Sequence, residues 1–324
     1  MTRTIRLSPP LWPVARRHFC RLRPLAAATT LLVTLLAARM PARAHDVWLE
    51  PETFFAVPGQ EIGVPLRMGE RLRVEDQKPF HRDAVTRFQL VFSSPRKRPL
   101  DLLTLTQEGQ QPFGRIRLDG GNALLVLDRS QRRLTLDAEK FNRYLADENQ
   151  TAALTQRAQL GQSTQLGKER YIRYLKALVQ DREPSAAPAV LYRRRIGQRL
   201  EILLENDPAK VRVGQRLSVK VIFDGRPLPG MKVSALHRDR DGTDARILSG
   251  TTDARGRTSF AIDAPGFWLV RLVYLRPIAP ADRKDGDDSQ WESFWSSYSF
   301  AVRLLPAVSA TTMPGSSSPT AVRP

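Results

Sequence analysis

Cysteine is almost absent from this chain of 324 residues, which contains a single one, Cys20. Cys20 lies within a predicted export signal and follows Arg-His-Phe, whereas a lipoprotein site has small and aliphatic residues there. The mature protein is therefore expected to have no thiol. This excludes disulfides, thiolate metal sites and cysteine nucleophiles, and leaves packing to stabilise the fold.

Long hydrophobic runs are also absent. The apolar run Leu25–Ala38 has 14 residues, fewer than the roughly 20 that a membrane-spanning helix needs. Residues 1–44 contain eight arginines, no lysine and no acidic residue, and they end in Ala42-Arg43-Ala44. This pattern predicts a secretory signal cleaved after Ala44 and a periplasmic protein with no later membrane span. Arg16-Arg17 leaves twin-arginine export open beside ordinary secretion.

Histidine is scarce as well, because only His45, His81 and His237 follow the predicted cleavage site. No Gly-x-Ser-x-Gly elbow is present, and no pair among the 33 acidic residues stands in a recognisable catalytic context. The sequence therefore predicts a protein that is not an enzyme.

Basic residues exceed acidic ones. The whole chain carries a formal charge of +18, and without the eight arginines of the signal 43 basic residues face 33 acidic ones, which gives +10. In an exported protein this balance favours anionic envelope surfaces over nucleic acid, which is not an expected partner, and a generally basic proteome explains it better still, so the charge alone predicts no ligand.

Turn and strand patterns divide the mature chain. Residues 45–136 show short apolar stretches broken by turns, such as Arg87 to Phe92, with Phe88, Leu90 and Phe92 on one face. This segment is predicted to be an N-terminal β domain. Asp119-Gly120-Gly121-Asn122 is predicted to form a turn between two strands.

Residues 137–188 are predicted to form a helical insert and linker. Asp137 is a good N-cap, and Phe141 and Leu145 follow at helical spacing. A second helix is expected from Gly167 to Gln180, where apolar residues also recur at helical spacing. The Pro- and Ala-containing segment 181–188 follows as the linker.

Residues 189–304 alternate apolar and polar positions in short, regularly spaced runs, including Leu200–Leu204 and Leu217–Phe223. Such runs predict a C-terminal β-sandwich of the immunoglobulin or transthyretin type. Residues 305–324 are rich in Ser, Thr and Pro and are expected to be disordered. The predicted fold is mainly β, with two β-sandwich-like domains and a helical insert between them.

Several motifs carry a family resemblance. Gly225–Val233, Thr252–Arg257 and Pro265–Val270 resemble a transthyretin-like or carboxypeptidase-regulatory-like β-sandwich. Together with His45-Asp46-Val47-Trp48-Leu49-Glu50-Pro51 and Trp291-Glu292-Ser293-Phe294-Trp295, they resemble an exported bacterial family of unknown function labelled a NikM-like component of nickel transport. The resemblance implies a periplasmic, β-rich protein linked to nickel or cobalt uptake, with a metal transporter in the inner or outer membrane as its partner.

Cleavage after Ala44 would make His45 the first residue of the mature protein. An N-terminal histidine offers an amine and an imidazole as nitrogen ligands for one metal ion. His45 is therefore predicted to bind Ni²⁺, Co²⁺ or Cu²⁺, with Asp46, His81 or His237 completing the site. The spacing shows no convergence, and the contexts of His81 and His237 favour solvated surface residues over metal ligands.

Tryptophan residues are predicted to be structural anchors. Trp48 lies three residues after His45 and is expected to fix the mature N-terminus, while Trp291 and Trp295 are expected to pack between sheets or domains. The predicted function is thus a periplasmic, non-catalytic binding protein that handles nickel, cobalt or copper ions. The alternatives are an envelope-interaction or carbohydrate-binding module without metal, and a copper-dependent oxidative enzyme.

Overall fold

A computed structural model describes residues 45–94, 96–183, 190–238, 245–283 and 285–304. Contacts divide the chain into two units, Met1–Ala42 and Arg43–Pro324, and every described residue belongs to the second unit. The predicted signal and the predicted disordered tail lie outside the described residues, as does most of the predicted linker. Within the described ranges, no helix is long and apolar enough to cross a membrane.

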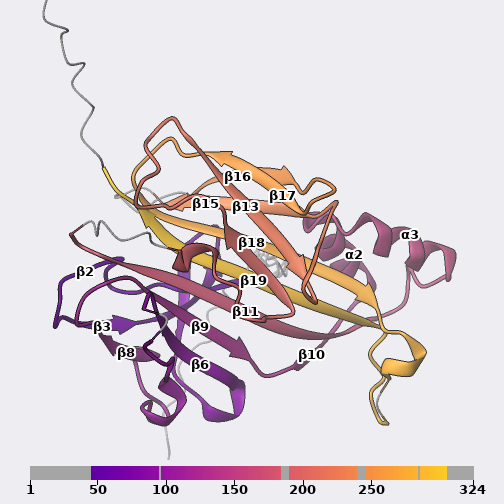
Figure 1. Cartoon of the computed structure of the whole chain (residues 1–324). Helices are drawn as coiled ribbons and strands as arrows, with labels where there is room; N and C mark the ends of the chain where they lie inside the picture. The colour runs from indigo at the N-terminus through magenta and orange to yellow at the C-terminus, as the bar shows by residue number, and fades with distance from the viewer. Residues whose placement is uncertain (1–44, 95, 184–189, 239–244, 284, 305–324) are drawn as a thin grey trace, which may run out of the picture. The chain divides into compact units, whose positions relative to one another are not determined.

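The fold is mainly β, as the sequence predicts, and is built on one large sheet (Figure 1). In the described part of the chain this central sheet has ten strands, in the order β16-β15-β18-β19-β11-β9-β6-β7, with β2 and β10 both paired to β11. The strands are β2 (Phe55–Ala56), β6 (Val85–Phe92), β7 (Leu100–Asp101), β9 (Ala123–Arg129), β10 (Arg132–Leu136), β11 (Gly167–Asp181), β15 (Lys232–Arg238), β16 (Ala245–Thr251), β18 (Gly266–Pro277) and β19 (Trp291–Val302).

One face of the central sheet is covered by a smaller antiparallel sheet, which makes a β-sandwich. Alternate residues of β11, β18 and β19, such as Leu178, Trp268 and Phe294, pack against Val219 and other inward residues of that sheet. This arrangement buries one side chain in two along each strand. The covering strands are β12 (Leu200–Leu204), β13 (Arg216–Phe223), β14 (Arg226–Pro227) and β17 (Arg257–Ala261).

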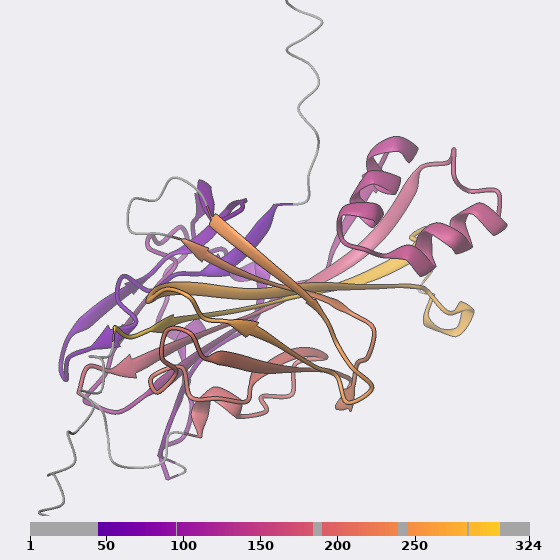
Figure 2. The same cartoon turned by 90° about the horizontal axis from the view of Figure 1, so that it is seen from above.

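The opposite face is covered by the N-terminal strands and by two helices (Figure 2). The remaining residues of β11, β18 and β19 point to this side, so the long strands are buried on both faces. The covering elements are β1 (Asp46–Leu49), β3 (Glu61–Val64), β4 (Leu66–Glu70), β5 (Arg73–Lys78), β8 (Gly114–Arg117), α2 (Ala138–Asp147) and α3 (Thr151–Gln159). Short 3₁₀ turns connect the elements at η1 (Arg82–Ala84), η2 (Leu102–Thr104), η3 (Leu191–Arg193) and η4 (Pro280–Asp282).

Several local predictions are confirmed. Helix α2 begins where expected, and the Asp137 carboxylate caps it by accepting a hydrogen bond from the Lys140 backbone N–H. Phe88, Leu90 and Phe92 share one buried cluster, as their alternation predicts. In each case the pattern is local, so the chain neighbours alone determine it.

The predicted helix from Gly167 to Gln180 is wrong, because these residues form strand β11. β11 pairs with β9 on one side and with β19 on the other. A strand with both faces buried loses its period-2 alternation, and the apolar residues that remain here also match a helical stripe. The second helix is instead α3, which the sequence analysis did not predict.

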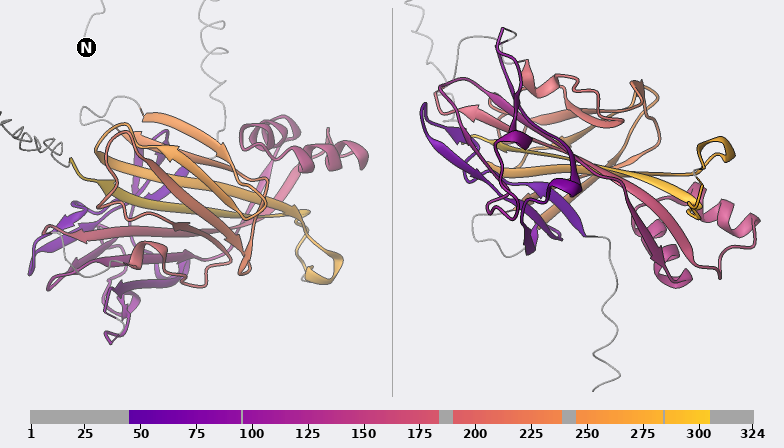
Figure 3. Two further views of the ribbon diagram at one scale, coloured as in Figure 1. Left: turned by 45° about the horizontal axis from the view of Figure 1, so that its top comes forward. Right: turned by 90° about the horizontal axis from the view of Figure 1, so that it is seen from below.

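The central sheet runs across the predicted domain boundaries. β11 lies inside the predicted insert, β9 comes from the predicted N-terminal domain and β19 from the predicted C-terminal domain, yet all three are adjacent strands. The two helices pack at one end of the long strands (Figure 3). The described residues thus share continuous packing around one sheet.

Candidate functional site

Strand β1, which directly follows His45, is held firmly against the central sheet. β1 pairs with β4, and the side chain of Trp48 is completely buried in a cluster with Leu72, Leu236 and Leu269. The indole N–H of Trp48 donates a hydrogen bond to Glu50 at 2.8 Å. Trp48 thereby fixes the position of the residues just before it.

Two contacts hold His45 in position. Its ring Nε2 lies 2.6 Å from the Glu75 carboxylate on β5, and its backbone carbonyl accepts a hydrogen bond from Arg173 at 3.1 Å. The imidazole side chain remains 42% exposed. Since Glu75 engages Nε2, the other ring nitrogen, Nδ1, is the one on the side of the residue's own main chain.

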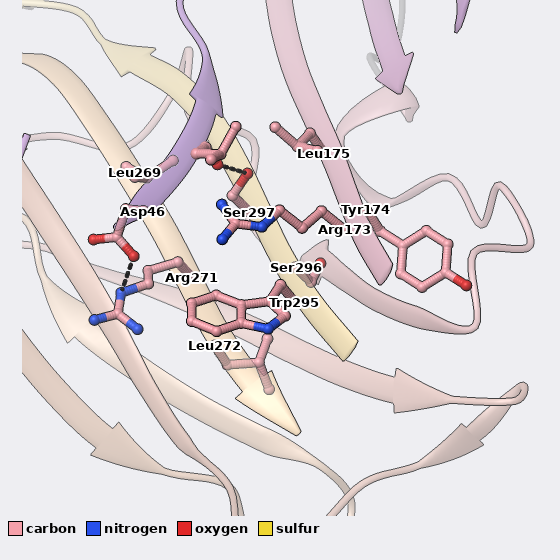
Figure 4. A pocket seen from close by; sticks show the side chains of 11 residues that line it. Asp46, Arg173, Tyr174, Leu175, Leu269, Arg271, Leu272, Trp295, Ser296 and Ser297 are labelled. Atoms are coloured by element: carbon pink, nitrogen blue, oxygen red, sulfur yellow. Dashed lines mark hydrogen bonds and ion pairs between the residues drawn. The ribbon is translucent and has the colours of Figure 1, made fainter. Parts of the chain in front are cut away.

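Asp46 is buried and belongs to a chain of ion pairs (Figure 4). Its carboxylate lies 2.9 Å from the Arg271 guanidinium on β18, and Arg271 also contacts both oxygens of Glu148, at 2.6 and 2.8 Å. Burial raises the pKa of Asp46 to about 6, even though Arg271 acts in the opposite direction. The Asp46 carboxylate is therefore buried in the protein interior and paired with Arg271.

Arg173 on β11 lies on the same face of the sheet, beside the central strand β19. Its guanidinium is 4.8 Å from the centroid of the Trp295 ring, which in turn stacks on Tyr144 of α2 at 5.9 Å. The Ser297 hydroxyl donates a hydrogen bond to the Val47 carbonyl at 3.1 Å. Side chains of β11 and β19 thus hydrogen-bond to the main chain of His45 and Val47.

Glu169, four residues before Arg173 on β11 and close to Tyr144 of α2, is a buried acid with few partners. The Ser293 hydroxyl donates to its Oε1, and the Tyr144 hydroxyl donates to the same atom at 3.5 Å. Its Oε2 has no partner among the described residues, and the same is true of the indole nitrogen of Trp291, which faces Glu169 across the strand register. Burial raises the pKa of Glu169 to about 7.

A cavity of about 210 Å³ opens beside this cluster. The volume is smaller than that of an ordinary ligand pocket, roughly 300–1,000 Å³. Its lining is mostly charged, which suits solvent or a small polar molecule. The lining residues are Asp46, Glu70, Arg71, Tyr144, Asp147, Glu148, Leu236, Ile247 and Arg271.

The other predicted metal ligands lie elsewhere. His81 contacts Glu108 at 2.5 Å in a loop after β5, and His237 is buried with its Nε2 against the Pro265 carbonyl at 3.0 Å. His237 also packs on Trp268, so it points to the sandwich face of the central sheet, opposite Asp46. No group of three His, Cys, Asp or Glu side chains suited to a metal ion occurs among the described residues.

The tryptophans predicted as anchors are all interior residues. Trp48 and Trp291 are almost completely buried and Trp295 is 8% exposed. Trp291 and Trp295 pack in the cluster that joins the central sheet to the helices. Trp268 lies in the sandwich core. These four side chains therefore present no exposed aromatic platform.

Sequence reasoning missed several residues of the site, namely Glu75, Glu148, Glu169, Arg173 and Arg271. Glu169 and Arg173 lie in the segment predicted to be a helix, which hides their place on one face of a strand. With the segment taken as a strand, Arg173 points to the β1 side. The other three residues carry no local signal, because they come together only through the tertiary fold.

The chain belongs to the family described as "Domain of unknown function (DUF4198)", whose profile matches residues 42–276. No curated protein matches. Among solved structures, there is a similarity to a "tetra-tandem repeat in extending region of large adhesion protein", at 9% identity and a TM-score of 0.20. That similarity covers 80% of this chain and 49% of the other, so this chain spans about half of that structure.

Proposed function

We propose that the mature protein is an exported, non-catalytic binding protein that holds a divalent transition metal, Ni²⁺, Co²⁺ or Cu²⁺, at His45. The observation that carries this proposal is the 2.6 Å contact between Nε2 of His45 and Glu75. With Nε2 engaged by a carboxylate, Nδ1 and the α-amine of an N-terminal His45 would be the two nitrogen ligands. A carboxylate on the far ring nitrogen orients a metal-binding imidazole and raises its basicity.

The surroundings of His45 support a site with few protein ligands. The Asp46 carboxylate is occupied by Arg271, so Asp46 acts as a support for the main chain. His81 and His237 have partners of their own and contribute nothing at His45. Two nitrogen ligands leave coordination positions open, which suits a protein that passes its metal to another one.

The family resemblance also supports a metal-handling role. The motifs that begin at His45 and the transthyretin-like pattern of the C-terminal half resemble an exported family labelled as a component of nickel transport. The predicted signal before His45 supports a periplasmic location. The partner in this proposal is a metal transporter in the inner or outer membrane, which would receive the ion from His45.

The experiment compares four purified proteins: one beginning at His45, one with a single glycine before His45, and the variants Glu75→Gln and His81→Ala. Mass spectrometry verifies each N-terminus, and calorimetric titration with Cu²⁺ and Ni²⁺ measures affinity. The added glycine replaces the amine and imidazole chelate of His45 by one through the glycine amine, the His45 amide nitrogen and Nδ1, so the affinities for Cu²⁺ and Ni²⁺ should change. Glu75→Gln should weaken it about 10–100-fold, whereas the matched control His81→Ala should leave it unchanged.

Equal affinity with and without the added glycine would refute the proposal. Affinity lost equally in His81→Ala would place the metal elsewhere. The copper-loaded protein is also incubated with a reductant and oxygen. Consumption of reductant that depends on an unblocked His45 would indicate an oxidative enzyme instead of a binding protein.

A further inference from the structure

Three exposed segments of the chain carry a concentration of positive charge. They are residues 96–98, which follow β6, residues 193–195 at the end of η3, and the turn that contains Arg226. All seven basic side chains are exposed; residues 96–98 and 193–195 contain no acidic residue, and Arg226, the first residue of β14, follows the turn Asp224-Gly225. Together these seven side chains form a basic surface, which consists of Arg96, Lys97, Arg98, Arg193, Arg194, Arg195 and Arg226.

Contacts tie the three segments together. Arg194 donates a hydrogen bond to the Phe92 carbonyl, at the end of β6, at 3.4 Å. Arg195 donates to the Gly225 carbonyl, next to Arg226, at 3.3 Å. The segment 193–195 therefore lies between the other two, and the charges form one surface.

The charge of the basic surface is largely unneutralised. Arg194 and Arg195 donate to backbone carbonyls, and Lys97 lies 3.9 Å from the Phe92 ring. Among the described residues, the nearest carboxylate at ion-pair distance is Asp119, 4.0 Å from Lys97. Asp224, beside the turn, is already held by both nitrogens of Arg199.

Three exposed arginines elsewhere in the described residues provide a contrast, because each is ion-paired. Arg115 pairs with Glu61 at 3.1 Å, Arg132 with Asp83 at 2.9 Å and Arg246 with Asp263 at 2.5 Å. These three arginines are neutralised by carboxylates, whereas the charges of the basic surface are clustered and largely unpaired.

Exposed apolar side chains flank these charges. Leu100 follows the segment 96–98 and is 42% exposed, and Val190 precedes the segment 193–195 and is 44% exposed. Cationic and apolar residues mixed on one exposed face are typical of proteins that lie on a membrane surface. Six of the seven basic residues are arginine, whose planar guanidinium can bind two phosphate oxygens at once.

We propose that the basic surface docks the protein onto the phosphate headgroups of an anionic phospholipid membrane. The attraction is electrostatic, with Leu100 and Val190 entering the headgroup region. Each basic residue near such a membrane strengthens binding about fivefold, so removal of three charges should weaken it about 100-fold. The interaction is independent of any metal at His45.

The test uses the protein beginning at His45, without metal, in sedimentation with vesicles of phosphatidylcholine alone or mixed with phosphatidylglycerol. Binding should occur only to the mixed vesicles and should fall as salt is added. The triple variant Arg193→Gln/Arg194→Gln/Arg195→Gln should bind about 100-fold more weakly. The control Arg115→Gln/Arg132→Gln/Arg246→Gln loses the same net charge from paired positions and should bind almost like the wild type.

Thermal melting verifies that both triple variants are folded, and Arg96→Gln/Lys97→Gln/Arg98→Gln provides a second variant of the basic surface. Equal losses in the surface and control variants would overturn the proposal in favour of a general charge effect. Equal binding to both vesicle types would overturn it as well. So would a failure to sediment with mixed vesicles while the protein binds soluble polyglutamate, which would indicate an acidic protein partner.

Discussion

Replacing Glu169 by glutamine removes a buried acid that lies between the central sheet and helix α2. The wild-type carboxyl is 1% exposed and has one oxygen without a partner among the described residues. The amide has a similar shape and cannot ionise. The substitution therefore isolates the effect of charge at this position on the free energy of unfolding.

The direction of the pH dependence follows from how many protons the folded and unfolded states bind. Burial raises the pKa of Glu169 from 4.5 to about 7, so between these pH values the folded protein keeps a proton that the unfolded chain has lost. Stability attributable to Glu169 should therefore fall as the pH rises from about 4.5 to about 7 and stay constant above that. At about 1.4 kcal/mol per pH unit, the fall amounts to about 3 kcal/mol.

Urea unfolding of the wild type and Glu169→Gln at a series of pH values between 4.5 and 8 measures this effect. The quantity to follow is the difference in unfolding free energy between the two proteins, because a constant cost of the substitution cancels from its pH dependence. The wild type should lose about 3 kcal/mol relative to the variant across the series. Parallel curves would refute the assignment of a raised pKa to Glu169.

Asp46→Asn provides a companion measurement with a different pH window. Burial raises the pKa of Asp46 from 3.8 to about 6, so its contribution should fall between these two values and be flat above pH 6. A difference curve for Asp46→Asn that still changes between pH 6 and pH 7.5 would show that the two acids are not independent.

Three further substitutions test the packing. Lys176→Met should destabilise the fold by about 3–5 kcal/mol, because it leaves the completely buried Glu201 without its charged partner, 3.1 Å away. In urea unfolding, the double variant Lys176→Met/Glu201→Gln should regain most of this stability. A double variant as unstable as the single one would contradict the argument. Trp48→Ala should cost about 3–5 kcal/mol, and faster amide exchange in β1 than in β9 would show detachment of the N-terminal strand. Gly167→Ala should lower the melting temperature, because a Cβ at this position would collide with the Phe141 ring. An unchanged melting temperature would show that the ring can move aside.

The short elements of the fold were predictable from the sequence wherever their signal is local. Leu200–Leu204 is strand β12, and the Asp137 cap begins α2. A cap needs only the next few residues, and a half-buried strand shows its alternation directly. The strand β11 was missed because neighbours on both sides and cores on both faces determine it.

The candidate site was predictable only in part. The sequence drew attention to His45 and Trp48, and the structure places Trp48 in β1 and His45 directly before it. Glu75 and Arg173, which position His45, come from β5 and β11, 30 and 128 residues away along the chain. No spacing rule relates such residues.

By itself, the sequence determined a mainly β chain whose described residues contain no thiol, with basic residues in excess and a histidine next to a predicted cleavage site. Composition and near-neighbour pattern suffice for these properties. Tertiary structure alone decided that β11 joins both halves in one sheet, that His237 faces away from Asp46, and that Glu169 is buried. These outcomes depend on which distant strands pair and on which face of the pleat each side chain lies.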